Sequence, residues 1–258
     1  MGNQTTASCE VDLRRSAEFR PGHQRNNAHC TMPIIPIEII SDPICPWCYI
    51  GYRTLQRTIT LYQKTYPGGS KDTFEISWRP YFIDEVEPEA SVLIHDRMAR
   101  RMTESQIIAA QTRLVRTGKP LGINFSFGGY IGSSRLAHRV LFLATQIGGG
   151  ELQCRVAEAL FKYQFELERD ISDPSVVVKV AVEGGIDEGG IRAFLAGSGG
   201  VEEVEYEAKA ARERLKLQGV NGVPCFVIGG EVRFEGAGDW EEFFEAFVAA
   251  REAATSSS

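Results

Sequence analysis

The sequence predicts an α/β fold in which a long helical segment interrupts one sheet. Three observations lead to this prediction: the folded part opens with a strand, a helix and a second strand; the stretch 88–200 has helical patterning; and a helix, two short strands and a final helix close the chain. With 258 residues, of which 43% are hydrophobic and 24% charged, the chain has the composition of a globular protein of one or two domains.

The first unit of the fold spans residues 34–82. IIPIEIISD (34–42) is short, apolar and rich in β-branched residues, as a buried strand is. Pro46 suits the first position of a helix, and apolar residues then recur at helical spacing until Pro67-Gly68-Gly69 breaks the pattern. TFEISWRPYF (73–82) alternates like a second strand, so the three elements form a βαβ unit.

Helix signals fill the segment 88–200. Thr103 and Gln106 form a capping box ahead of an amphipathic run, and Ser133 or Ser134 opens the run RLAHRVLFLATQIGGG. The following run, ELQCRVAEALFKYQFELERD, is apolar on two faces, which indicates a helix in the middle of a bundle.

The last unit of the fold begins with VEEVEYEAKAARERLKLQG (201–219), whose acids come first and bases last, as the helix macrodipole favours. A proline loop, the strands CFVIGG and EVRFEG and the helix DWEEFFEAFVAAR follow. We therefore predict one α/β domain made of residues 34–87 and 201–252, with residues 88–200 as an inserted helical domain.

Residues 1–33 differ from the rest of the chain. They are polar, carry no periodic apolar face and lack the apolar region of a secretory signal, so we expect a disordered leader. The Met-Gly start of this leader fits a loose myristoylation pattern, which we interpret as a chance match. The formal net charge of −6 argues against nucleic-acid binding, and no apolar run is long enough for a membrane span. We expect a cytoplasmic protein, and the sequence is compatible with a homodimer.

The stretch SDPICPWCYIG (41–51) places Cys45 and Cys48 at the corner between the first strand and its helix. A thiolate at a helix N-terminus is stabilised by the helix dipole and by free backbone N–H groups, whereas a cysteine one turn later lies beneath it. Pro46 sets the helical backbone and Trp47 shields one side. This favours a redox centre over inert structural thiols, and over a zinc site, for which no second cysteine or histidine pair is present.

Gly222-Val223-Pro224 precedes a predicted strand. A proline is structurally permitted at the first position of a strand. In a redox fold, a cis bond between Val223 and Pro224 would hold this loop beside the cysteines and present the Val223 backbone to an extended substrate chain. The order of the elements favours this second interpretation.

The motifs DPICPWCYIG, WRPYFI, AHRVLFLA, LFKYQFE, GVPCFVIGG and FEGAG resemble those of the DsbA-like thioredoxin-fold oxidoreductases, most closely the FrnE-type subgroup. The resemblance extends from about Ile34 to Arg251. It implies a thioredoxin fold with an inserted α-helical domain and thiol–disulfide oxidoreductase or isomerase activity. It also implies that Cys45 is the nucleophile, Cys48 the resolving thiol and Pro224 the cis-proline.

Two positions depart from that subgroup: Cys225 stands where an aromatic residue is usual, and Ser133-Ser134 where asparagine is common. We expect Cys225 to be buried in a central strand, with a third redox thiol as the alternative, and His138 to be a hydrogen-bonded structural histidine.

The substrate expected from the resemblance is a disulfide-containing protein or a small thiol. No cofactor or metal is implied, and glutathione is an alternative reductant. Two other functions stay open: a glutathione-dependent transferase or isomerase of the kappa or 2-hydroxychromene-2-carboxylate isomerase type, which typically carries serine near the position of Cys45, and a non-catalytic binding module.

Overall fold

A computed structural model describes residues 34–256, apart from the side chains of Val232 and Arg233, so the expected leader 1–33 lies outside the described residues. Its main sheet has the strand order β2-β1-β5-β6, in which β1 is parallel to β2 and antiparallel to β5, and β5 is antiparallel to β6. The strands are β1 (Ile34–Ser41), β2 (Thr73–Pro80), β5 (Cys225–Ile228) and β6 (Glu231–Glu235). The predicted α/β fold is confirmed, and β5 is central as expected.

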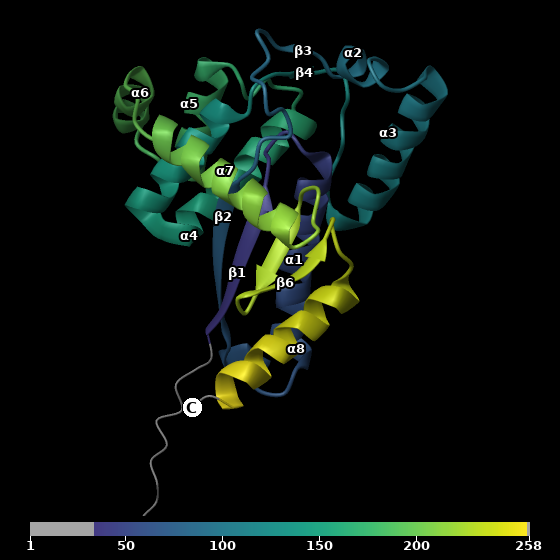
Figure 1. The fold of residues 1–258 in the computed structure, drawn as a ribbon, viewed down its shortest axis with the longest axis vertical. Helices are drawn as coiled ribbons and strands as arrows, with labels where there is room; N and C mark the ends of the chain where they lie inside the picture. Colours follow the sequence, from purple (N-terminus) through teal and green to yellow (C-terminus); the bar gives the residue numbers. More distant parts are fainter. Residues whose placement is uncertain (1–33, 257–258) are drawn as a thin grey trace, which may run out of the picture. The chain divides into compact units, whose positions relative to one another are not determined.

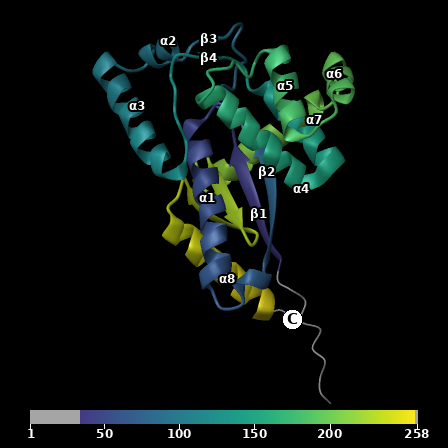
Figure 2. The ribbon, with the colours of Figure 1, turned by 180° about the vertical axis from the view of Figure 1, so that it is seen from behind.

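Helices cover both faces of this sheet (Figures 1 and 2). On one face lie α1 (Pro46–Thr65) and α8 (Trp240–Ser256), which meet where Tyr62 packs edge-on against Phe247. On the other face lies α7 (Val201–Leu217), which crosses in front of the sheet in Figure 1. Alternating side chains of the inner strands therefore enter two separate apolar clusters, one beneath α1 and α8 and one beneath α7.

The segment between β2 and α7 is mostly helical, as predicted. Its elements are β3 (Val92–Leu93), α2 (Ile94–Ala99), α3 (Glu104–Gly118), β4 (Tyr130–Ile131), α4 (Arg135–Phe165), α5 (Pro174–Gly184) and α6 (Glu188–Ala196); the short 3-10 turns are η1 (Gly69–Lys71) and η2 (Lys119–Leu121). The pairing of β3 with β4 was not predicted, because two-residue strands are too short to show alternation.

The helix ends of this segment follow the capping signals in part. The capping box of Thr103 and Gln106 is present at the start of α3. At the start of α4 it is Ser133 whose hydroxyl accepts the backbone N–H of Arg135, at 3.3 Å, whereas the side chain of Ser134 makes no capping bond. The two helices predicted on either side of the glycines 148–150 are continuous except for a kink at Gly149, whose φ of 62° and ψ of −160° are non-helical.

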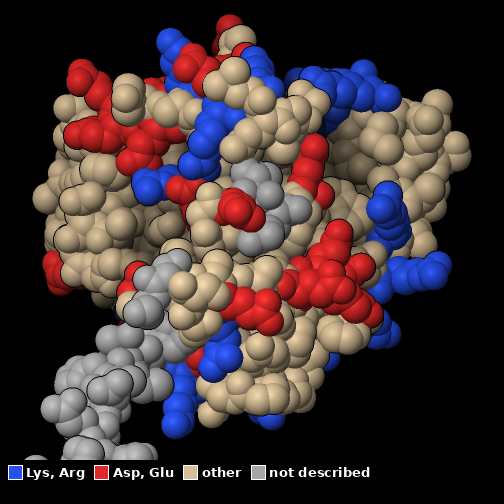
Figure 3. Space-filling view, turned by 60° about the horizontal axis from the view of Figure 1, so that its bottom comes forward, with Lys and Arg blue, Asp and Glu red and all other residues tan. Residues whose placement is uncertain are grey.

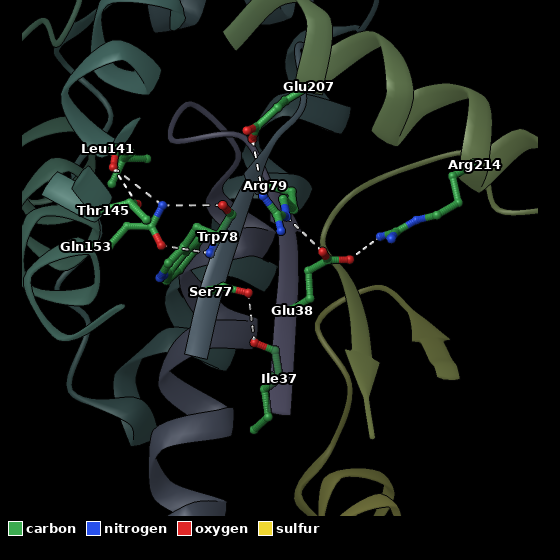
Figure 4. Close-up of polar contacts among 10 residues, drawn as sticks. All are labelled: Ile37, Glu38, Ser77, Trp78, Arg79, Leu141, Thr145, Gln153, Glu207 and Arg214. Carbon is green, nitrogen blue, oxygen red and sulfur yellow. Dashed lines mark hydrogen bonds and ion pairs between the residues drawn. The ribbon is translucent and has the colours of Figure 1, made fainter. Parts of the chain in front are cut away.

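The helical segment is joined to the free edge of the sheet by Gln153 of α4 (Figure 4). Its side-chain oxygen accepts the backbone N–H of Trp78 at 2.9 Å, and its amide nitrogen donates to the carbonyls of Trp78 and Leu141 at 3.3 and 3.4 Å. Gln153 thus satisfies β2 as a neighbouring strand would, and it closes an edge that could otherwise pair with another chain.

A charged cluster joins the sheet to α7 (Figure 4). Glu38 of β1 accepts from Arg79 of β2 at 2.8 Å and from Arg214 of α7, and Arg79 also reaches Glu207 at 3.5 Å. Burial of the Glu38 carboxyl would raise its pKa, but the hydrogen bonds from Arg214 and Arg79 outweigh it and hold that pKa below the ordinary value.

Candidate active site

Cys45 occupies the N-cap position of α1, between the end of β1 and the first helical turn. Its backbone is extended, with φ of −97° and ψ of 113°, and its N–H donates to the carbonyl of Asp42 at 2.9 Å, which closes a tight turn. Pro46 fills the first helical position, and the first turn of α1 contains no acidic residue. Cys45 therefore lies at the positive end of the helix, and no acid within the first turn of α1 offsets that charge.

The loop before β5 lies against this sulfur. The Cys45 thiol donates to the carbonyl oxygen of Val223 across a distance of 3.7 Å, although 178 residues separate the two along the chain. The Val223–Pro224 peptide bond is cis. The structure thus brings together the CPWC corner and the Gly-Val-Pro loop that the sequence singled out.

The two cysteines of the pair differ in environment. Both are free thiols; Cys45 is 5% exposed and Cys48, one turn deeper, is 0% exposed. Burial raises the pKa of the Cys48 thiol, and the adjacent Cys45 raises that pKa further, while contacts with the Ser41 hydroxyl and the Asp42 backbone partly oppose this. Cys48 is therefore a protonated, shielded thiol, whereas Cys45 lies nearer to solvent.

Trp47 lies between the two cysteines in sequence and is half-buried. The guanidinium of Arg113, on α3, sits over its ring at 4.6 Å from the centroid. A cation above an indole ring is attracted by the π electrons, so this contact fixes one side of the CPWC turn against the helical segment.

Asp42 and His138 are buried polar residues that the sequence analysis did not connect with the turn. The Asp42 carboxylate accepts the backbone N–H of Ile44 at 3.2 Å and that of Ile83 at 2.8 Å. His138 Nε2 lies 3.2 Å from the carbonyl of Tyr81 and 3.7 Å from Asp42 Oδ1. Asp42 thus ties the cysteine turn to the chain that leaves β2. A polar residue directly after a buried strand is the signal that could have identified it.

Cys225 is fully buried, as expected, and lies on the other face of the sheet. It packs with Val227 and Leu215 in the cluster beneath α7, whereas Cys45 and Cys48 belong to the cluster beneath α1 and α8. Burial raises the pKa of the Cys225 thiol to about 11. This placement removes the support for a relay through a third thiol.

Within residues 34–256, no group of three or more histidine, cysteine, aspartate or glutamate side chains is arranged to hold a metal ion. The same residues contain no helix with the length and apolar character needed to cross a bilayer.

The geometry defines the class of protein: an α/β protein with a CxxC pair at a helix N-terminus beside a cis-proline loop. The family model described as DSBA-like thioredoxin domain matches residues 36–248, which is most of the chain. The chain therefore belongs to the DSBA-like thioredoxin domain family. A search of curated proteins finds no match.

Solved structures agree on the fold, a thioredoxin fold with an inserted helical region. A probable DsbA oxidoreductase from Streptomyces coelicolor is 24% identical, with a TM-score of 0.72 over 84% of this chain and 89% of that one. A 2-hydroxychromene-2-carboxylate isomerase is 16% identical, with a TM-score of 0.57 over 86% and 100%. The cytosolic disulfide reductase DsbM from Pseudomonas aeruginosa is 17% identical, with a TM-score of 0.55 over 86% and 98%; it is also solved with GSH.

Proposed function

We propose that this protein is a thiol–disulfide oxidoreductase in which Cys45 attacks and Cys48 resolves. The observation that carries the proposal is the asymmetry of the two thiols: Cys45 lies at the positive end of α1 and keeps 5% of its surface exposed, whereas Cys48 lies one turn deeper and has none exposed. A nucleophilic thiol requires access and a stabilised thiolate, whereas a resolving thiol requires only proximity to the first.

The reaction balances as two exchange steps. The Cys45 thiolate attacks one sulfur of a substrate disulfide, that S–S bond breaks, and the leaving thiolate takes up a proton. Cys48 then loses its proton and attacks the Cys45 sulfur, releasing the second substrate thiol and forming a Cys45–Cys48 disulfide. The substrate gains two electrons and the enzyme loses them; the reverse sequence oxidises a dithiol.

The substrate in this proposal is a disulfide-containing protein, and the substrate-binding residues are Pro46, Trp47, Val223 and Pro224. Pro46 and Trp47 directly follow the attacking cysteine, and the carbonyl of Val223 already accepts a hydrogen bond from its thiol. A substrate chain laid along this loop would take up main-chain hydrogen bonds in the same way. The location proposed is the cytoplasm, and FrnE-type is the proposed subgroup.

A glutathione-dependent activity is the second candidate. It is favoured by the similarity in fold to a 2-hydroxychromene-2-carboxylate isomerase and to a disulfide reductase solved with GSH. The two intact cysteines favour disulfide exchange, with glutathione as an alternative reductant of the Cys45–Cys48 disulfide.

Insulin reduction with dithiothreitol as electron donor tests the proposal. We expect wild-type protein and the control variant Cys225→Ala to reduce insulin at the same rate, and Cys45→Ser to be inactive. If Cys45→Ser retained wild-type turnover, Cys45 would not be the attacking thiol. If all three proteins were inactive while binding glutathione, the glutathione-dependent candidate would replace disulfide exchange.

A further inference from the structure

A cleft of about 340 Å³ opens beside the cysteine pair, on the side of the helical segment. Ile44 and Pro46, the residues on either side of Cys45, form one end of it. The rest is formed by α2 and the turn that follows it, by Leu114 of α3, by the chain around β4, by the chain that leaves β2, and by the end of α4. A molecule in this cleft would therefore contact the two chain neighbours of the attacking cysteine.

The floor of the cleft is apolar and adaptable. Met98, Met102, Leu114 and Phe127 all line it, and both methionines are only half-buried. Methionine is flexible and polarizable, and surfaces that accept varied apolar side chains use it often. The floor is thus suited to large apolar side chains of more than one shape.

The rim of the cleft is positive. Its only carboxylate among the described residues is Asp84, which Arg97 neutralises through two hydrogen bonds of 2.6 and 3.0 Å. Arg100 and Arg101 also line the cleft, both are exposed, and neither guanidinium has an ion-pair partner in the part of the chain that the structure describes. Two positive charges are therefore available to a ligand.

This positive rim contrasts with the protein as a whole. Residues 94–118, which contain α2 and α3, hold five arginines against two acids, in a chain whose formal net charge is −6. In Figure 3 several blue side chains lie on the right, the side on which α3 lies in Figure 1, whereas red ones gather nearer to the centre and at the upper left. A cluster of one sign beside a cleft attracts ligands of the opposite sign.

We propose that this cleft binds a polypeptide segment of the substrate protein in which a large apolar residue adjoins the reacting cysteine and acidic residues follow it. The inference rests on the proposed function and names its substrate class. Apolar side chains would fill the floor of Met98, Met102, Leu114 and Phe127, and carboxylates would pair with Arg100 and Arg101. Glutathione offers carboxylates but no large apolar side chain, so the floor favours a polypeptide.

The test measures binding without chemistry, by fluorescence anisotropy of labelled peptides that carry serine in place of cysteine. The first peptide has leucine beside that serine and glutamates beyond it, the second has lysines for the glutamates, and the third has serine for the leucine. The proteins are wild type, the double variant Arg100→Glu/Arg101→Glu, and the double variant Lys209→Glu/Lys216→Glu. Both lysines of this control are exposed on α7, do not line the cleft, and give the same change in net charge.

We expect wild type and the lysine control to bind the first peptide equally and more tightly than the other two. The arginine variant should bind it roughly tenfold or more weakly, as expected when two exposed charge pairs become repulsions. Equal binding by both double variants would overturn the proposal. So would equal binding of the first and third peptides, or displacement of the first peptide by glutathione. Failure of insulin reduction with peptide preference intact would reject the proposed function alone.

Discussion

Replacement of Asp42 by asparagine tests how the cysteine turn is held. The fully buried carboxylate of Asp42 accepts two backbone N–H groups, from Ile44 within the turn and from Ile83 beyond β2. Asparagine has nearly the same shape but only one acceptor oxygen. One of the two N–H groups must therefore face an NH₂ group, to which it cannot donate.

The cost follows from these two bonds. Losing one hydrogen bond to a charged acceptor removes about 1.5–3 kcal/mol, and weakening the other from a charged to a neutral acceptor removes about 0.5–1 kcal/mol more. We expect Asp42→Asn to lower the free energy of unfolding by roughly 2–4 kcal/mol, measured by urea denaturation with an unchanged slope.

The control is Asp96→Asn on α2, whose side chain is exposed and contacts only His95 among the described residues, at 3.6 Å. Its stability should stay within about 0.5 kcal/mol of wild type. If Asp42→Asn were equally mild, the carboxylate would not be what holds the turn.

Three further variants test other parts of the structure. Because the pKa of Glu38 is depressed in the folded protein, this carboxylate stabilises the fold above its ordinary pKa of 4.5, and the stabilisation is lost as the pH falls through the folded-state pKa. Glu38→Gln should therefore be less stable than wild type at pH 7. In acid titrations followed by circular dichroism, its stability should also fall less steeply below pH 4.5. An equal acid slope in both proteins would refute this. Cys225→Ala should cost of order 1 kcal/mol, and wild-type Cys225 should resist alkylation at pH 7 in the native protein; rapid native alkylation would show that its thiol is accessible. Gln153→Leu should leave the buried backbone N–H of Trp78 without an acceptor and lower the free energy of unfolding by about 1–3 kcal/mol in urea denaturation. No such loss would be seen if water replaced the amide.

The sequence predicted the elements that depend on local patterns. Pro46, the break after α1, the capping box at Thr103 and the order of the last four elements all report on local backbone preferences, and each element lies where expected. The alternation of β5 likewise placed Cys225 on a buried face, because side chains of a strand point to opposite sides in turn.

What the sequence did not predict depends on distant partners. Asp42 gains its role from Ile83, and Gln153 from Trp78, across 41 and 75 residues. The contact of Arg113 with Trp47 similarly requires α3 to fold back over the start of α1. No local period encodes such contacts, since each follows from how the helical segment packs against the sheet.

The central claim is that Cys45 attacks and Cys48 resolves, and trapping the mixed disulfide tests it most directly. The variants Cys48→Ser and Cys45→Ser are incubated separately with a disulfide-bonded peptide, quenched with acid, and mapped by non-reducing mass spectrometry. We predict a stable adduct on Cys45 in the first variant and essentially none on the buried Cys48 in the second. An adduct on Cys48 that forms as fast as the one on Cys45 would contradict the assignment of the two thiols.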